Sequence, residues 1–332
     1  MLKRAITIKS LLLIVFLMVN LAACAAESKT QQAIPVAIKL RWTHNAQFGG
    51  LYAADQEGYF AAEGVEATFL EGGPGTDPIA AVLDGEAQFG VAGADVILLA
   101  RSQGKPVRAV ATIYQRNPVV FFALAETGIT SPQQFAGKTI RATLDMLPTL
   151  HAMMTFINVP PDTYQIIELP SDIAQFASGE VPIWGGFVTG MALDLQQAGY
   201  EINVIYPDNY GVHFYADTLF TTDAFMAESP DVVTRVVKAT SDGLTFAITQ
   251  PEAIGPMVAL YNDQADLSAE SLRMMASIPL IQSGTTRIGW MDQTKWQEMH
   301  DILLAQGMLP NEVDVSTVFT LEFLEKSIGE GE

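Results

Sequence analysis

The sequence predicts an α/β protein built from two similar units, and three observations favour this class. Short apolar segments alternate with helical stretches along most of the chain, which is the pattern of strands packed against helices. A helix end, a Gly-Glu turn and a short strand occur at residues 83–90 and again at 177–184. The chain has 332 residues, 49% of them hydrophobic, which is enough for two separate cores.

The elements of the first half follow from local patterns. Apolar residues at every second position from Val36 to Leu40 predict a strand, and 49–57 predicts a helix that ends at Gly58. Asp77 and Pro78 form a helix start in the N-cap and first-turn order. Asp95 is predicted to cap a further helix that runs to residue 103. Strands are expected at 65–70, 88–91 and 107–113, with a glycine-rich turn at 71–75.

The second half repeats the alternation and then becomes helical. Residues 230–250 carry an apolar stripe at a 3.6-residue spacing, which predicts an amphipathic helix. Pro251, Pro256 and Pro279 are expected to divide the later helices, and this helical region could pack back on the first unit. The remaining elements are strands at 119–124, 138–142, 165–169, 181–184 and 202–205, a helix at 150–156, and a helix that ends near residue 198.

The first residues have the pattern of a bacterial lipoprotein signal. Lys3, Arg4 and Lys9 are followed by an apolar run at 11–19, which is shorter than the ~20 residues that a bilayer-spanning helix needs. Leu-Ala-Ala precedes Cys24, the only cysteine, as in the lipobox. An ordinary signal peptide with an accidental cysteine is the alternative. We predict a signal peptide at 1–23, lipid attachment (palmitate included) at Cys24 and a tether at 24–33.

Composition and motifs exclude several classes of function. With 37 acidic and 18 basic residues and a net charge of −19, the chain lacks the basic face that nucleic-acid binding needs. One cysteine and four dispersed histidines predict no disulfide, metal site or resident cofactor. No Gly-x-Ser-x-Gly or His-Glu-x-x-His motif occurs. Gly137-Lys138-Thr139 leads into a strand, whereas a phosphate loop opens a helix. We therefore predict no catalytic residues.

Aromatic and polar residues gather where the predicted strands end. Open α/β sheets bind ligands outside the carboxyl ends of their strands. Flat rings with a few polar groups suit a planar heteroaromatic ligand, and each aromatic pair adds about 0.5–1.5 kcal/mol beyond area burial. Core packing is the alternative, and we favour it for Phe89, Phe121, Phe122 and Phe246. The predicted ligand-binding residues are Trp42, His44, Asn45, Phe48, Asp95, Tyr114, Gln115, Trp184, Gly186, Phe187, Tyr210 and Tyr215.

Several segments resemble solute-binding proteins of the NMT1/THI5-like family. They are Trp42-Thr43-His44-Asn45-Ala46-Gln47-Phe48-Gly49-Gly50, Gly58-Tyr59-Phe60, Glu63-Gly64-Val65-Glu66, Gly72-Gly73-Pro74 and residues 211–221. The resemblance implies a two-lobed periplasmic-binding-protein fold of type II, with a mixed sheet in each lobe and ligand in the cleft between them. Lobe one would be 34–117 plus 219–330, and lobe two 118–218.

The same resemblance implies the partners. Such proteins deliver ligands to the permease subunits of an ABC importer and, through them, to an ATPase. We expect a monomer that is anchored outside the cytoplasm on the cell membrane by the lipid at Cys24. Whether this is the inner or the outer membrane stays open.

The family also contains an enzyme branch, the fungal pyrimidine synthases of thiamine biosynthesis. That branch has a cofactor-linked lysine where Glu57 stands here, and a cysteine cluster where residues 211–215 read Gly-Val-His-Phe-Tyr. An export signal also argues against it. We predict a protein that is not an enzyme and keep an exported THI5-like enzyme as a remote alternative. A ligand-free scaffold or sensor lipoprotein is a third class.

The resemblance also bears on the ligand. In the formyl-aminopyrimidine binder, an Asn-Glu pair follows the threonine that corresponds to Thr189, whereas Gly190 and Met191 follow it here. This removes an acidic partner for an aminopyrimidine edge and opens room for a larger, neutral-edged ring system. We therefore expect riboflavin, with the thiamine precursor formyl-aminopyrimidine as the alternative.

Overall fold

The computed structural model describes residues 33–328. The predicted signal peptide, Cys24 and nearly all of the predicted tether lie outside these residues. From Ile34 onward the chain groups into one unit. Between residues 33 and 328, none of the helices combines the length and the apolar character that crossing a membrane requires.

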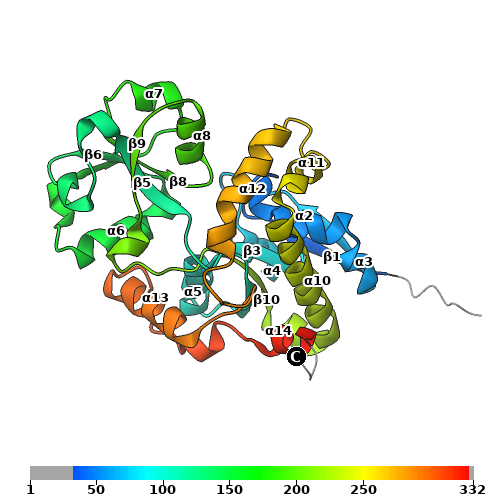
Figure 1. The fold of residues 1–332 in the computed structure, drawn as a ribbon. Coiled ribbons are helices and arrows are strands. Elements are labelled where there is room, and N and C mark those ends of the chain that lie inside the picture. Colours follow the sequence, from blue (N-terminus) through cyan, green and yellow to red (C-terminus); the bar gives the residue numbers. More distant parts are fainter. Residues whose placement is uncertain (1–32, 329–332) are drawn as a thin grey trace, which may run out of the picture. The chain divides into compact units, whose positions relative to one another are not determined.

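The first of two mixed sheets has the strand order β2-β1-β3-β10-β4 (Figure 1). β1 runs parallel to β2 and β3, whereas β10 is antiparallel to both of its neighbours. The strands of this sheet are β1 (Ile34–Lys39), β2 (Val65–Leu70), β3 (Phe89–Gly93), β4 (Val107–Thr112) and β10 (Asp217–Thr222). We call this sheet and its helices lobe one.

The second sheet has the order β7-β6-β8-β5-β9, and its strands lie together in the green part of the ribbon (Figure 1). β6 is parallel to β7 and β8, and β5 is antiparallel to β8 and β9. The strands are β5 (Val119–Leu124), β6 (Thr139–Arg141), β7 (Gln165–Ile167), β8 (Ile183–Phe187) and β9 (Ile202–Ile205). We call this sheet and its helices lobe two.

The two sheets are equivalent position by position. β7, β6, β8, β5 and β9 stand where β2, β1, β3, β10 and β4 stand, with the same parallel and antiparallel neighbours. The sequence echo lies at matching places, since α4 (Pro78–Leu83) leads into β3 and α7 (Ile173–Ala177) leads into β8. Gly85 and Gly179 follow these helices with φ of 78° and 71°, a left-handed conformation that favours glycine. The prediction of two similar α/β lobes with mixed sheets is confirmed.

Two crossovers join the sheets, and the antiparallel strand of each sheet is the one that enters from the other lobe. Residues 113–118 lead from β4 into β5, and residues 206–216 lead from β9 into β10. The expected boundary at 218/219 falls inside β10. We therefore propose lobe boundaries within the two crossovers.

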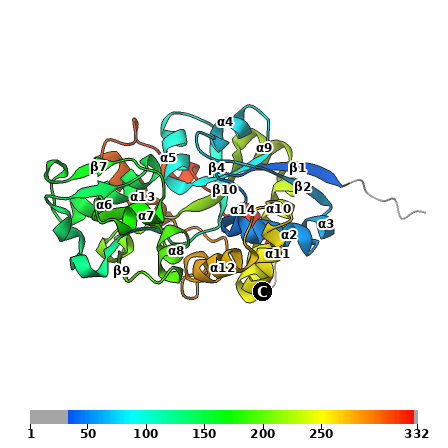
Figure 2. The same cartoon turned by 90° about the horizontal axis from the view of Figure 1, so that it is seen from above.

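Helices cover both sheets (Figure 2). In lobe one, the long helix α10 packs against α2 and α14, and its buried stripe includes Val233, Val236 and Leu244. The α-helices of lobe two are α6 (Leu147–Phe156), α7 and α8 (Met191–Gln197). The other α-helices are α2 (Gly49–Gln56), α3 (Tyr59–Ala62), α4, α5 (Ala94–Ser102), α9 (Asp223–Glu228), α10 (Pro230–Thr249), α11 (Ile254–Val258), α12 (Leu267–Ile281), α13 (Gln293–Ala305) and α14 (Glu322–Ile328).

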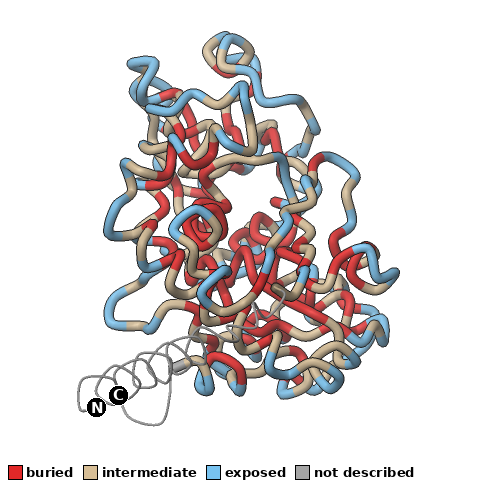
Figure 3. The backbone as a smooth tube through the Cα atoms, turned by 90° about the vertical axis from the view of Figure 1, so that its right-hand side faces the viewer, coloured by how far each residue is buried: buried red, intermediate tan, exposed pale blue. Residues whose placement is uncertain are grey.

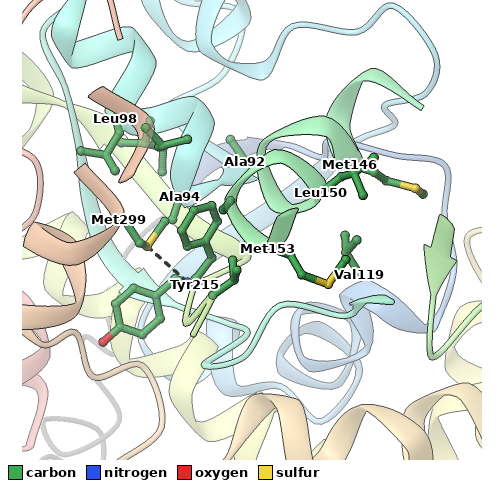
Figure 4. Packing of buried hydrophobic residues seen from close by; sticks show 14 of the residues in the cluster. Ala92, Ala94, Leu98, Val119, Met146, Leu150, Met153, Tyr215 and Met299 are labelled. Atoms are coloured by element: carbon green, nitrogen blue, oxygen red, sulfur yellow. Dashed lines mark hydrogen bonds between the residues drawn. The ribbon is translucent and has the colours of Figure 1, made fainter. Parts of the chain in front are cut away.

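One of the apolar clusters contains buried residues of both lobes. Strands β3, β4, β5, β8 and β10 are almost entirely buried, whereas β2, β7 and β9 are partly exposed. Buried segments lie in the interior of the tube drawing (Figure 3). One cluster contains Ala94 and Leu98 of α5 together with Leu150 and Met153 of α6, and Met299 of α13 joins them (Figure 4). The lobes therefore share a buried apolar contact in addition to their two covalent crossovers.

Three expectations about elements were wrong in detail. Asp95 is not the N-cap of α5: Gly93 holds that position and Asp95 lies in the first turn, where its charge favours the helix N-terminus. Pro279 lies inside α12 near its C-terminal end instead of dividing two helices, because buried Leu280 and Ile281 hold the last turn in place. Gly186 and Phe187 belong to β8 itself, since the strand begins later and extends further than predicted.

Candidate functional site

A cavity of about 330 Å³ lies between the lobes, at the carboxyl ends of β8 and β9 and the amino end of β5. The first crossover contributes Arg116 and Asn117, and Val188 follows β8. On the lobe-one side the wall is α12, through Ala276 and Pro279. Further lining residues are Val119, Thr149, Tyr206, Pro207, Asp208, Asn209, Val212 and Leu280. The cavity therefore combines apolar walls with amide and carboxylate groups contributed by the crossovers.

Lobe one presents a network of charged groups at the end of β1. The Arg41 guanidinium donates to Asp217 at 3.0 Å, and the amide of Gln47 donates to the other oxygen of that buried carboxylate at 2.5 Å. Burial lowers the pKa of Arg41, but the nearby carboxylates of Asp217 and Asp95 raise it by more than burial lowers it. The pKa is therefore above its ordinary value, and the side chain stays charged. Burial raises the pKa of Asp95, and Arg41 counteracts part of this shift. This network fixes the segment that precedes Trp42.

Trp42 lies at the surface, and its backbone is held firmly. Its side chain is 45% exposed. The carbonyl of Trp42 accepts a hydrogen bond from Gly72 N at 3.0 Å. A Cβ on Gly72 would lie 2.3 Å from the Leu40 carbonyl oxygen, so the close approach of the two segments requires glycine. The glycine-rich turn after β2 thus positions an exposed indole at the end of β1.

His44 belongs to an aromatic cluster. Its Nδ1 lies 2.8 Å from the hydroxyl of Tyr52, and its ring stacks on Tyr261 at 5.7 Å between centroids. Tyr52 and Tyr261 stack at 4.3 Å. Burial lowers the pKa of His44, which favours the neutral imidazole. Asn45 caps the following turn, where its side-chain oxygen accepts from Gln47 N at 2.7 Å. These contacts order the loop, and they engage His44 and Asn45 with the protein itself.

Two aromatic residues predicted to bind ligand lie in the cores. Trp184 is 0% exposed, and its indole N–H donates to the Val181 carbonyl at 3.0 Å. Its ring packs edge-on against Phe176 of α7, because β8 alternates its side chains between the two faces of the sheet. Phe48 is buried beside Tyr52. In this structure Trp184 and Phe48 support the walls and do not line them.

The other predicted residues do not line this cavity. Gly186 faces Phe122 on the neighbouring strand, where a Cβ would lie 3.1 Å from the ring, and Phe187 ends β8 half-buried. Tyr114 donates to Ser277 of α12 at 3.1 Å, and Tyr210 is half-buried within the second crossover. Gln115 and Tyr215 line a second cavity. The residues that line the first cavity are sequence neighbours of these positions, namely Arg116, Asn117, Val188 and Asn209.

Sequence reasoning missed the polar link between the lobes. Arg273 of α12 donates to Asp194 of α8 at 2.7 Å and to Glu270 at 2.7 Å. Glu270 is buried and accepts from Ala46 N at 2.6 Å. The i,i+3 spacing of Glu270 and Arg273 indicates a helical pair, but nothing in the sequence points to Asp194, which is 79 positions away. No cluster of three or more histidine, cysteine, aspartate or glutamate side chains that could hold a metal occurs in residues 33–328.

Comparison with a solved structure agrees with this architecture. The periplasmic aliphatic sulphonate binding protein SsuA of Escherichia coli superposes with a TM-score of 0.69 at 13% identity, over 86% of this chain and 91% of that protein. Two mixed sheets flanked by helices and joined by two crossovers define a two-lobed periplasmic-binding-protein fold.

The chain belongs to the NMT1/THI5-like family, whose model matches residues 45–254. The riboflavin-binding protein RibY of Chloroflexus aurantiacus is 27% identical, over 87% of this chain and 86% of the relative. A formylaminopyrimidine-binding protein of Halalkalibacterium halodurans is 25% identical, over 90% and 94% respectively. A 4-amino-5-hydroxymethyl-2-methylpyrimidine phosphate synthase of Legionella pneumophila is 22% identical, over 65% and 70%.

Proposed function

We propose that this protein is the substrate-binding component of an ABC importer and that it captures a planar heteroaromatic vitamin, riboflavin in preference to others. It would pass the vitamin to permease subunits, which couple to an ATPase. It would act as a monomer outside the cytoplasm, anchored to the cell membrane by a lipid on Cys24. The observation that carries the proposal is the cavity whose walls come from both lobes.

The chemistry of that cavity supports an uncharged ring system as the ligand. Its volume of about 330 Å³ lies within the range of small-molecule sites. Val188, Tyr206 and Pro279 offer apolar area, and Asn117 and Asn209 offer amide groups. An isoalloxazine ring presents flat faces and an edge of alternating donors and acceptors, which such groups complement. Trp42 is proposed to add aromatic contact from lobe one.

Lobe closure would couple binding to transport. A ligand that contacts both lobes stabilises whichever arrangement makes all contacts at once, so it shifts the population toward that form. The Arg273–Asp194 ion pair already spans the lobes. The permease would then distinguish loaded from empty protein by the arrangement of the lobes.

The alternative ligand is formylaminopyrimidine, which the second relative is named for. Gly190 is the N-cap of α8 and Met191 begins that helix, so neither supplies a carboxylate for an aminopyrimidine edge. Asp194, one turn later, is paired with Arg273. These features favour the neutral-edged ligand.

An enzyme of the THI5 type is the remote alternative, and one relative is named as a synthase. Glu57 occupies the C-cap of α2, where the enzyme branch has its lysine. The segment 211–215 contributes buried Phe214 and Tyr215 to the core. We therefore propose a binding function without catalysis.

The test is a riboflavin titration of protein that lacks residues 1–24. Quenching of flavin fluorescence with a dissociation constant in the micromolar range or tighter is expected, and Asn117→Ala should weaken it at least tenfold. Formylaminopyrimidine, thiamine and an alkylsulfonate serve as comparison ligands in a thermal-shift screen. No response to riboflavin at ~100 μM would refute the riboflavin assignment. Turnover of any of these compounds would instead support the enzyme.

A further inference from the structure

A second cavity of about 670 Å³ lies beside the two crossovers, and the proposed vitamin site does not use it. The first crossover contributes Gln115 and Arg116, and the second contributes Tyr215. The opposite wall is the loop between α12 and α13, together with the first turn of α13. Only Arg116 lines both cavities. This second cavity is called the crossover cavity below.

The walls of the crossover cavity are fixed by hydrogen bonds between its parts. The buried Gln115 amide donates to the Trp290 carbonyl at 2.7 Å, and Asp292 N donates to the Tyr215 hydroxyl at 2.8 Å. The Lys295 ammonium donates to the Gln115 carbonyl at 2.5 Å. Both crossovers are therefore tied to the loop and to the first turn of α13 that form the opposite wall.

Three cations line this cavity in a chain whose net charge is −19. Arg116 is neutralised by Asp208 at 2.6 Å. Lys295 is half-buried 4.3 Å from the Tyr215 ring centroid. Arg287 is exposed. Among residues 33–328, neither Lys295 nor Arg287 forms an ion pair with a carboxylate.

The acidic group on the wall is already engaged. The Asp292 carboxylate caps α13, accepting from Thr294 N at 2.8 Å and Lys295 N at 3.2 Å. It therefore offsets the helix N-terminus. The carboxylates of Asp208, Glu298 and Asp292 act on the charge of Lys295 without forming an ion pair with it, and its ammonium is bonded to the Gln115 carbonyl. Lys295 and Arg287 line the same cavity, and an anion bound there would accept charge-assisted hydrogen bonds from both side chains.

We propose that the crossover cavity binds an oxyanion, the carboxylate or phosphate group of a small molecule, between the side chains of Lys295 and Arg287. Ser283 and Thr286 on the loop offer further hydroxyl donors, and Trp290 supplies an apolar wall. Because both crossovers contribute residues, an anion held here would bias the angle between the lobes. Its occupancy would then change the affinity of the vitamin site.

The test is isothermal titration of vitamin-free protein lacking residues 1–24 with inorganic phosphate and, separately, with succinate, at constant ionic strength. We expect saturable binding of one anion per chain. The probe that binds more tightly shows whether the site prefers a phosphate or a carboxylate group. Arg287→Ala and Lys295→Met should each weaken that binding at least tenfold. Lys326→Ala, an exposed cation paired with Glu322, is the matched control and should bind normally.

Arg287 is exposed, so its variant tests the proposal even if Lys295→Met does not fold. Absence of saturable binding of both anions would overturn the proposal, and so would unchanged binding in Arg287→Ala. Riboflavin titrations of the same variants separate the two sites. Riboflavin binding without anion binding would overturn the crossover site alone, and anion binding without riboflavin binding would overturn the vitamin assignment alone.

Discussion

Trp42 and Trp184 show how burial separates two residues that look alike in the sequence. Both lie near glycines close to the end of a predicted strand, yet the Trp42 side chain is 45% exposed and that of Trp184 is 0% exposed. Trp42 follows β1 and turns outward, whereas Trp184 lies inside β8 under α7. Their substitutions should therefore affect different properties.

Trp42→Ala should weaken riboflavin binding at least tenfold and leave the free energy of unfolding within about 0.5 kcal/mol, as is usual for exposed side chains. Fluorescence titration and urea denaturation measure the two quantities. Leu260→Ala is the control, because this leucine is 66% exposed and lies two residues after α11. Equal affinities for the two variants would place the ligand away from Trp42.

Trp184→Ala should lower the free energy of unfolding by about 3–5 kcal/mol, because it empties a packed site beside Phe176. The variant should still bind riboflavin at temperatures where it remains folded. Urea denaturation with the wild type and Trp42→Ala in parallel gives the comparison. A stability equal to wild type would mean that Trp184 is not a core residue in solution.

Lys295 should make stability depend on pH. Burial lowers its pKa to about 8 from an ordinary value of 10.5, while Asp208, Glu298 and Asp292 raise it in part and Arg116 lowers it. Between these two values the unfolded chain binds more protons than the folded one, so the free energy of unfolding rises with pH in this window. This gain in the free energy of unfolding is complete above pH 10.5 and is lost as the pH falls through 8.

The measurement is urea denaturation of wild type and Lys295→Met at pH 7.5, 9 and 10.5. The stability of wild type relative to the variant should increase across the series. Phosphate binding by wild type should weaken over the same range as the ammonium loses its proton. A constant difference in stability would show that the lysine titrates as it does in water.

At the level of single residues, sequence patterns predicted which segments lie near the cavity but not which of their side chains line it. The ends of β1 and β8 and both crossovers were identified as the candidate site, but the cavity is lined by neighbours such as Asn117 and Val188. Which of two adjacent residues faces a cavity depends on strand register, and β8 begins two residues later than predicted. Arg41, Asp217 and Asp194 were missed because their partners are distant in the sequence.

At the level of elements, α12 carries the polar contact between the lobes through Arg273 and Asp194. The two side chains are 27% and 39% exposed, and such pairs are worth about 0.2–1 kcal/mol, or a factor of about 1.4 to 5. Asp194→Asn should therefore weaken riboflavin binding by about 1.4- to 5-fold if the bound form keeps this pair.

Asp242→Asn is the matched control for Asp194→Asn. Asp242 is 42% exposed and pairs with Lys238 inside α10, within one lobe. Its replacement should leave riboflavin affinity unchanged. If both variants lose the same affinity, the effect comes from charge alone and the link between the lobes contributes nothing.

Element boundaries were predicted best where local signals are strong. Residues 65–70 and 119–124 are β2 and β5 as expected, and Asp77 caps α4 through Ile79 N and Ala80 N. Errors arose where tertiary packing outweighs local preference. Pro279 is tolerated in α12 because the helix has two residues left after it and both are buried.

At the level of the whole molecule, the echo at 83–90 and 177–184 correctly indicated two lobes of one design. The sequence pattern alone could not show that β10 pairs with β3 and β4, because Asp217 pairs with Gly93 across 124 residues. Local periodicity contains no information about such pairing. The return of the chain to lobe one after lobe two was expected only from the resemblance to a family. The observed strand order shows how it is achieved, because β10 lies between β3 and β4.

The chain leaves lobe one after β4 and returns to it at β10, so lobe two is inserted between two neighbouring strands of lobe one. Thr112 of β4 and Thr218 of β10 are direct antiparallel partners, so a two- to four-residue hairpin turn could join them and omit the intervening chain. Phe121 and Ile205 are likewise partners in lobe two, whose own ends are therefore adjacent. Each lobe could be produced as a continuous chain, provided that the apolar face shared by α5 and α6 is made polar. The protein is thus a template for chimeras that exchange one lobe while keeping the other.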